Sequence, residues 1–183
     1  MVPKPNNETE KRLVVDLREL NTSIPLDRYE SPNCELCLQW LQQRENFSVF
    51  DLRWGFHQIA VTDETKKVFT FTTPIGTFCY NRLLMGFKNA MPIFQRVCNY
   101  TMGDSLWREC ILMVDDGVVG SSTLEEHRVH METCLSKLAA RHHSIKPSKM
   151  SILPDSIKYL GHKVTREGTC LLYTSDAADE EDS

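Results

Sequence analysis

The chain has 183 residues, of which 41% are hydrophobic and 25% charged, and its formal net charge is −4. This composition predicts one globular domain with a hydrophobic core and excludes a disordered or collagen-like chain. No apolar stretch reaches the roughly 20 residues that span a bilayer, and residues 1–12 are polar, so we expect no membrane segment and no signal peptide. An intracellular, cytoplasmic protein is therefore the expectation.

The hydrophobic patterns predict strands that alternate with helices. In chain order we expect a strand over 12–17 and a loop, a helix over 35–43, a strand over 47–52, a hairpin of 68–72 with 78–80, a helix over 89–102, a hairpin around 115–117, a helix over 123–140, and short strands over 149–153 and 157–160. This order predicts an α+β fold with helices on one face of a mostly antiparallel sheet.

Three carboxylates stand where predicted strands end. The apolar run 111–114 finishes at Asp115 and Asp116, and the strand 47–52 carries Asp51 near its end. Carboxylates that converge from separate segments suit a site for two divalent ions, and Mg²⁺ prefers oxygen ligands. A plain tight hairpin is the alternative, because Asp and Gly117 tolerate positive φ in a turn.

The seven cysteines are an odd number spread through apolar segments, which favours reduced thiols over a disulfide framework. A zinc site could combine the pair Cys34 and Cys37 with His127 and His130. No second close cysteine pair completes such a set, and the two histidines stand among charged residues typical of a solvated helix face. We therefore do not expect zinc.

The C-terminus accounts for the net negative charge of the chain. Without the five acids among the last eight residues the chain is close to neutral, which leaves room for a basic face. The segment from Cys170 to Ser183 looks like the translation of a transposase-type sequencing-library adapter joined in frame after Thr169. We assign residues 170–183 no role in fold or function and expect them to be disordered. An ordinary acidic tail is the alternative.

Seven sequence blocks occur in an order that resembles a known family. They are Arg12-Leu-Val-Val-Asp-Leu-Arg-Glu-Leu-Asn21, Phe47-Ser-Val-Phe-Asp-Leu-Arg-Trp-Gly-Phe-His-Gln-Ile59, Met85-Gly-Phe-Lys-Asn-Ala90 with Phe94-Gln-Arg96, Val114-Asp-Asp116, Glu125-Glu-His127 with His130, Pro147-Ser-Lys149 and Tyr159-Leu-Gly-His162. This order resembles reverse transcriptases of gypsy-type LTR retrotransposons, with retroviral and caulimoviral enzymes more distant. The resemblance implies a right-hand polymerase palm with a partial fingers subdomain over residues 1–169.

The resemblance implies an RNA-directed DNA polymerase that transfers a nucleotide from a dNTP to a primer 3′ hydroxyl. Asp51, Asp115 and Asp116 match the catalytic, metal-binding carboxylates, which would hold two Mg²⁺ ions, with Mn²⁺ as a substitute. The implied partners are an RNA or DNA template with its primer, a dNTP, and the remainder of a Pol polyprotein: thumb, RNase H and integrase. An active element would work in a virus-like particle.

Basic and aromatic positions of the family match further residues. Lys4 and Arg12 match cations that hold the triphosphate, although each is also an ordinary surface charge on a strand. Phe56 matches the aromatic residue on which the sugar packs and which excludes a 2′ hydroxyl; apart from the family, it would be assigned to the core. The resemblance thus adds three residues to nucleotide binding.

Three more nucleotide-binding residues follow the same resemblance. Met85 falls where the family places a residue against the nucleotide, and Gly86 where a glycine lets the template strand approach closely. Lys149 matches a lysine that protonates pyrophosphate, with a solvent-facing lysine as the alternative. These assignments depend on the family and not on spacing alone.

Some positions depart from the family pattern. Met113 stands where the family has tyrosine, Leu17 replaces an aromatic residue, and Gly117 replaces a bulky aliphatic one. The departures motivate an alternative function, a catalytically inactive remnant that binds nucleic acid or a protein partner. A two-metal nuclease would share the acids but would not explain Phe56 or Gly86.

Overall fold

The computed structural model describes the backbone of residues 2–4, 7–12 and 14–171 and the side chains of residues 14–171. Two compact units are formed. The first contains the described residues up to Tyr29 together with Trp54–Phe94, and the second contains Glu30–Arg53 and the described residues from Gln95 onward. No helix in the described part of the chain combines the length and apolar character that crossing a bilayer requires.

The first unit is built from short helices and two antiparallel hairpins. Its elements are β1 (Val2–Lys4), β2 (Asn7–Arg12), α1 (Arg18–Ser23), the 3-10 helix η1 (Gly55–Gln58), α3 (Asp63–Val68), β4 (Thr70–Thr73), β5 (Gly76–Cys79) and the start of α4 (Ala90–Met102). Leu17, Phe69 and Leu84 form its small core. The hairpin predicted around Pro74 is confirmed, with Thr73 paired to Gly76.

The sequence prediction was wrong in two places in this unit. The strand expected over 12–17 is not present over 14–17, because β2 already ends at Arg12. The loop expected after it begins with α1, since Leu17 lies in the core and its carbonyl accepts a hydrogen bond from Asn21 N–H at 2.8 Å. Helix α3 was missed because it buries no residue and therefore has no apolar periodicity. The Thr62 hydroxyl caps it by accepting from Thr65 N–H.

The second unit contains a four-stranded antiparallel sheet in the order β6-β7-β3-β8. Its elements are α2 (Cys34–Gln42), β3 (Asn46–Asp51), the rest of α4, the 3-10 helix η2 (Gly103–Ser105), β6 (Cys110–Met113), β7 (Asp116–Ser121), α5 (Leu124–Ala140), the 3-10 helix η3 (Pro147–Lys149), β8 (Ser151–Ile152), β9 (Ser156–Tyr159), β10 (His162–Thr165) and β11 (Gly168–Leu171). Strands β9, β10 and β11 form a second, smaller antiparallel sheet. The predicted α+β class with a mostly antiparallel sheet is confirmed.

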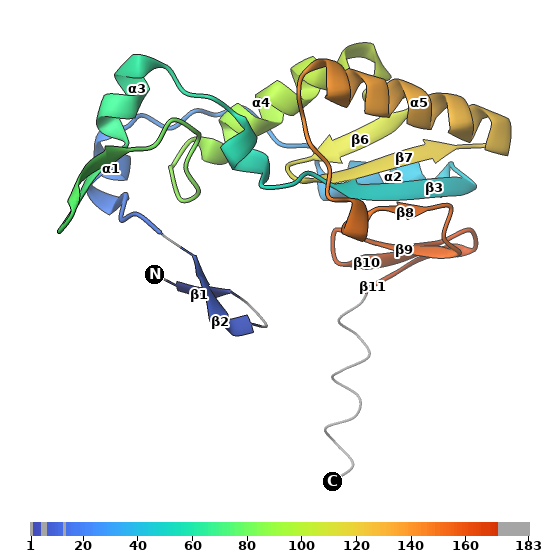
Figure 1. Cartoon of the computed structure of the whole chain (residues 1–183). Coiled ribbons are helices and arrows are strands. Elements are labelled where there is room, and N and C mark those ends of the chain that lie inside the picture. The colour runs from blue at the N-terminus through green and yellow to red at the C-terminus, as the bar shows by residue number, and fades with distance from the viewer. Residues whose placement is uncertain (1, 5–6, 13, 172–183) are drawn as a thin grey trace, which may run out of the picture. The chain divides into compact units, whose positions relative to one another are not determined.

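Both faces of the four-stranded sheet are covered. Helix α5 lies along one face (Figure 1), and Ser48 of β3 contacts it. The other face carries Trp40 and Leu41 of α2 with Tyr159 of β9 in one buried cluster. The expectation of helices on one face only was therefore wrong. Helix α2 has an apolar side of its own, and it buries that side against the face opposite α5.

The C-terminal boundary lies further along than expected. In β11, Cys170 pairs with Lys163 and Leu171 with His162, so regular structure continues two residues past Thr169. Residues 172–183 lie outside the described residues, and the adapter origin of the segment stays a prediction. Every cysteine in the described part of the chain is a free thiol, as expected.

A buried histidine joins three elements of the second unit. His127 of α5 is only 2% exposed, so the solvated face expected for it was wrong. Its Nε2 lies 2.7 Å from Ser48 Oγ, and its Nδ1 lies 3.1 Å from Ser121 Oγ. Because Ser121 Oγ donates to the Thr123 carbonyl, a neutral ring that donates from Nδ1 and accepts at Nε2 satisfies every group. Burial, and then the charge of His130, lower the pKa of His127.

This network predicts a loss of stability in mild acid. The unfolded chain binds a proton at His127 near pH 6.5 and the folded chain does not, so stability falls as pH drops below about 6.5. Between pH 7.5 and 5.5 we expect the thermal unfolding midpoint of wild type to fall by a few degrees more than that of His127→Gln, on the order of 3 °C. Exposed His142→Asn is the matched control and should follow wild type. Equal pH dependence in wild type and His127→Gln would contradict the assignment.

Candidate active site

The register of β3 against β7 places two acids face to face. Asp51 pairs with Asp116 at the last position of the ladder. Side chains at opposed positions of an antiparallel pair lie on one face, with Cβ atoms roughly 4.5–5.5 Å apart. Since Ser48 points toward α5 and side chains alternate, Asp51 and Asp116 lie on the face away from α5. Like charges at such positions are destabilising, so packing alone does not explain them.

The third acid occupies the turn between β6 and β7. Met113 pairs with Asp116, which leaves Val114 and Asp115 as the turn residues, and the Asp115 carbonyl accepts from Leu52 N–H at 2.9 Å. One carboxylate oxygen of Asp115, Oδ1, is buried without a hydrogen-bond partner. The structure therefore brings all three predicted acids to one end of the sheet.

Burial and the neighbouring negative charges change how Asp115 and Asp116 titrate. Burial, followed by the charges of Asp51 and Asp116, raises the pKa of Asp115 to about 6, against an opposing effect of Lys149. Desolvation and the Asp51 charge also raise the pKa of Asp116. Clustered carboxyl groups whose pKa values are raised by burial and by one another are typical of functional sites.

The acidic turn is held in a strained conformation by a buried glutamine. Val114, a β-branched residue, has φ 53°, which costs on the order of 1–3 kcal/mol. Gln95 of α4, fully buried, accepts from Val114 N–H at 2.9 Å and donates to the Leu112 carbonyl at 2.7 Å. Sequence reasoning assigned no role to Gln95, although a polar residue between the apolar Phe94 and Val97 of a buried helix face was a visible signal.

Gly117 does not take the turn position that the sequence suggested. It lies within β7 opposite Phe50, and a Cβ there would come within 2.2 Å of the Phe50 ring. The glycine is therefore required by the close approach of that ring, and Val114 supplies the positive φ of the turn. This packing gives a physical reason for a glycine where a bulky aliphatic residue was expected.

Lys149 contacts the acids directly. Its Nζ forms an ion pair with Asp51 Oδ2, and the hydrogen bond with Asp51 raises the pKa of Lys149. The Lys149 side chain is 56% exposed and that of Asp51 20% exposed. The solvent-facing alternative is thus only partly correct, because the side chain reaches from solvent into the acid cluster.

The remaining predicted site residues belong to the first unit. Phe56 is partly buried in η1, with its ring centroid 5.1 Å from that of Phe94. Met85 is 50% exposed, and Gly86 has φ 84° with open space where a side chain would stand. That φ alone accounts for glycine, so the approach of a template strand stays a prediction. Lys4 and Arg12 belong to β1 and β2, but their side chains lie outside the described residues.

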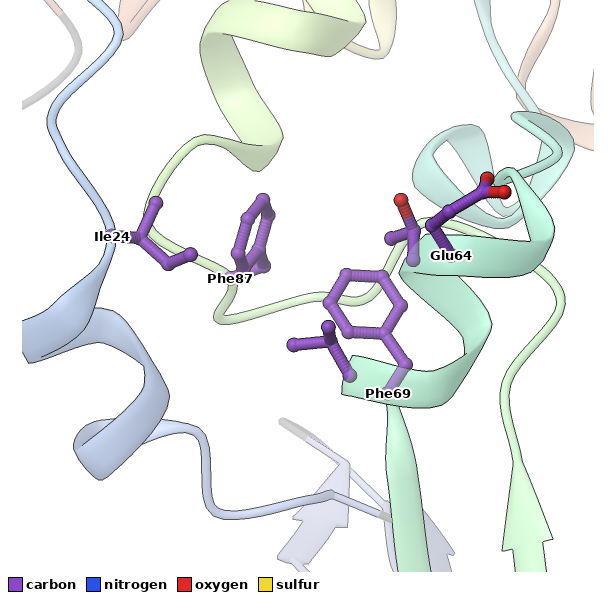
Figure 2. A pocket seen from close by; sticks show the side chains of 6 residues that line it. Ile24, Glu64, Phe69 and Phe87 are labelled. Carbon is purple, nitrogen blue, oxygen red and sulfur yellow. The ribbon is translucent and has the colours of Figure 1, made fainter.

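The first unit also has an apolar hollow of about 220 Å³. Ile24, Val68, Phe69 and Phe87 contribute its apolar lining, with Glu64 and Thr65 on α3. Figure 2 shows the Phe69 and Phe87 rings beside one another at this hollow, and their centroids lie 5.2 Å apart. Among the residues whose side chains the structure describes, Glu64 is the one ionisable residue lining this hollow, so they provide no acid–base or metal-binding set there. The acid cluster therefore remains the candidate site.

The chemistry of the acid cluster fits hard divalent cations. Its donor atoms are carboxylate oxygens, the ligands that Mg²⁺ selects. Asp115 Oδ1 is buried without a hydrogen-bond partner, and a bound cation or a proton would satisfy it. In the part of the chain that the structure describes, no group of three His, Cys, Asp or Glu side chains is arranged to hold a metal as it stands. In this arrangement one oxygen of Asp51 is engaged in the ion pair with Lys149.

Comparison with known proteins identifies the class to which this fold and site belong. Residues 2–164 match the family described as reverse transcriptase (RNA-dependent DNA polymerase). The chain belongs to this family, and the prediction from the sequence blocks is confirmed.

Particular relatives place the chain near transposon and viral polyproteins. It is 31% identical over 159 residues to the retrovirus-related Pol polyprotein from transposon gypsy of Drosophila melanogaster, covering 87% of this chain and 15% of that protein. It is 32% identical over 170 residues to the enzymatic polyprotein of cauliflower mosaic virus (strain NY8153), covering 90% of this chain and 25% of that protein. The chain thus spans only a small part of the relatives' length.

Solved structures support the same fold. A foamy viral protease–reverse transcriptase in complex with double-stranded DNA matches with a TM-score of 0.85 and 25% identity, covering 97% of this chain and 30% of that chain. The foamy viral enzyme in complex with an RNA/DNA hybrid matches with a TM-score of 0.80, again at 25% identity, covering 97% of this chain and 23% of that chain. The expected palm-like α+β architecture is therefore confirmed.

Gln95→Leu tests the support of the acidic turn. The substitution leaves the Val114 N–H and the Leu112 carbonyl buried without their partner, so we expect a loss of about 2–4 kcal/mol in the free energy of unfolding, measured by urea titration. Gln43→Leu, at the exposed end of α2, is the control and should change little. A loss below about 1 kcal/mol for Gln95→Leu would show that the clamp is not needed.

Asp115→Asn should stabilise the metal-free protein. The pKa of the folded carboxyl, about 6, lies above its unfolded value of 3.8, so the cost of ionising Asp115 grows from about pH 4 to pH 6 and is complete above pH 6. In chelator at pH 7.5 we expect a gain of about 1–2 kcal/mol, discounted for partial exposure, that shrinks toward pH 4.

Asp104→Asn is the matched control for this measurement. A hydrogen bond from Lys137 lowers the pKa of Asp104, so its removal should shift the unfolding midpoint in the opposite direction. If Asp115→Asn is instead destabilising at pH 7.5, the carboxylate contributes to the fold, and the acid cluster is not under electrostatic strain.

Proposed function

We propose that this chain is the catalytic part of an RNA-directed DNA polymerase, which transfers a nucleotide from a dNTP to a primer 3′ hydroxyl. One observation carries the proposal: the cross-strand pair of Asp51 with Asp116, completed by Asp115 in the adjoining turn. Membership of the reverse transcriptase family supports it. The foamy viral relatives bound to double-stranded DNA and to an RNA/DNA hybrid support a primed RNA or DNA template as partner.

In this proposal the three carboxylates hold two Mg²⁺ ions, which Mn²⁺ can replace. Asp51 and Asp116 reach the ions from facing strands, and Asp115 reaches them from the turn. When bound, the ions would lower the pKa of the primer hydroxyl and neutralise charge on the departing pyrophosphate. The negative charge of the cluster, which Lys149 compensates only in part, supports this role, because it favours divalent cations over any neutral ligand.

The other residues bind and orient the nucleotide. Lys4 and Arg12 would hold the triphosphate, and the Phe56 ring would pack on the sugar. Met85 would contact the nucleotide, and the open space at Gly86 would admit the template. These roles follow the family pattern together with the exposure of Met85 and the partial burial of Phe56.

Lys149 would donate a proton to pyrophosphate. Its contact with Asp51 supports a place at the site. The proposal also includes the remainder of a Pol polyprotein, with thumb, RNase H and integrase, as partner. Its support is that similar proteins from the gypsy and 297 transposons are Pol polyproteins. An intracellular, cytoplasmic location, in a virus-like particle for an active element, completes it.

Primer extension on an RNA template tests the function. The chain is joined to the fingers and thumb segments of a gypsy-type Pol polyprotein, and incorporation of dNTPs is followed with and without Mg²⁺. We expect Mg²⁺-dependent extension that Asp115→Asn reduces at least about 100-fold, because one ligand of the site is lost, whereas Asp104→Asn extends normally. Extension that survives Asp115→Asn would refute the site, and absent extension with no metal-dependent rise in the unfolding midpoint would favour an inactive remnant.

A further inference from the structure

The backbone around Lys149 is fixed to the strand that carries Asp51. Upstream, Lys146 N–H donates to the Asp51 carbonyl at 2.8 Å, and downstream Ser151 pairs with Val49. Between these contacts the turn of η3 is closed by Lys149 N–H, which donates to the Lys146 carbonyl at 3.0 Å. The Cα atom of Lys149 is therefore held beside the acid cluster.

The side chain of Lys149 is less restricted than its backbone. It is 56% exposed, whereas Asp51, its ion-pair partner, is only 20% exposed. A long, exposed side chain can leave one oxygen for another with little change in packing, and ion pairs at exposed side chains are weak. The charge of Lys149 also acts on Asp115 and Asp116, where it opposes the repulsion among the acids. Its ammonium is thus a counter-ion for the whole cluster.

We propose that Lys149 is a stand-in cation for the metal: its ammonium neutralises Asp51 while no divalent ion is bound, and an entering ion displaces it. The inference rests on the proposed function, because it concerns the same three acids. Two cations drawn to Asp51 Oδ2 repel one another, so the ion pair and a metal at that oxygen exclude each other. The residue is a positioning residue for metal loading, apart from its proposed part in proton transfer.

Metal affinity of the chain provides the first test. Mn²⁺ binding is measured by isothermal titration calorimetry for wild type, Lys149→Gln, Lys149→Arg and the neighbouring Lys146→Gln. Lys149→Gln removes the competing charge and should bind Mn²⁺ about three- to tenfold more tightly. Lys149→Arg keeps the charge and Lys146→Gln keeps Lys149, so both should remain near wild type. Affinity of Lys149→Gln equal to or weaker than that of wild type would overturn the inference.

The wild-type chain offers a second test that needs no substitution. Acetylation of lysine side chains is followed by mass spectrometry with and without Mg²⁺. If the metal releases the Lys149 ammonium from Asp51, its labelling rate should rise about threefold, while that of Lys146 stays constant. A rate for Lys149 that is unchanged or lower in Mg²⁺ would contradict displacement.

Asp115→Asn separates the failure of this inference from the failure of the proposed function. If Asp115→Asn and wild type bind Mn²⁺ equally, the acids are not the metal site, and the inference falls with the proposed function. If Asp115→Asn abolishes binding while Lys149→Gln leaves the affinity unchanged, the metal site stands and only the stand-in role of Lys149 is refuted.

Discussion

Antiparallel pairing of β3 with β7 fixes the distance between Asp51 and Asp116, and the candidate site depends on this register. A shift of one residue would turn one carboxylate to the other face of the sheet. The same pairing places Gly117 under the Phe50 ring, where no larger residue fits. The register of β7 against β3 thus links the packing of the Phe50 ring on Gly117 to the spacing of the acids.

The two ends of the β3–β7 strand pair differ in whether their buried polar groups have hydrogen-bond partners. At one end, His127 and the hydroxyls of Ser48 and Ser121 form a buried network in which the ring nitrogens and both hydroxyls find partners. At the other end, Asp115 keeps an oxygen without a partner, and Val114 holds a strained φ. The fully hydrogen-bonded network thus lies away from the proposed chemistry, and the strained backbone lies at the acids. Enzymes commonly place strain at the active site and stabilising contacts elsewhere.

Charge compensation connects the acids to their surroundings. The cluster needs a cation, and Lys149 meets that need in part, because its backbone is bonded to β3 on both sides. Burial and the charges of Asp51 and Asp116 still raise the pKa of Asp115 against the opposing charge of Lys149, so one ammonium compensates the cluster only in part. The site therefore favours cations of higher charge than an ammonium, such as divalent metal ions, which agrees with the family to which the chain belongs.

The sequence by itself determined the acids, the family, the hairpins and the capped helix α5, because short-range signals such as apolar runs and the Thr123–Glu126 capping box encode them. Only the tertiary structure decided the burial of His127, the clamp of Gln95 on the acidic turn and the contact of Lys149 with Asp51. Each of these joins residues from separate elements, 98 positions apart for Lys149 and Asp51. Their partners are set by strand register and helix packing, which local periodicity does not contain.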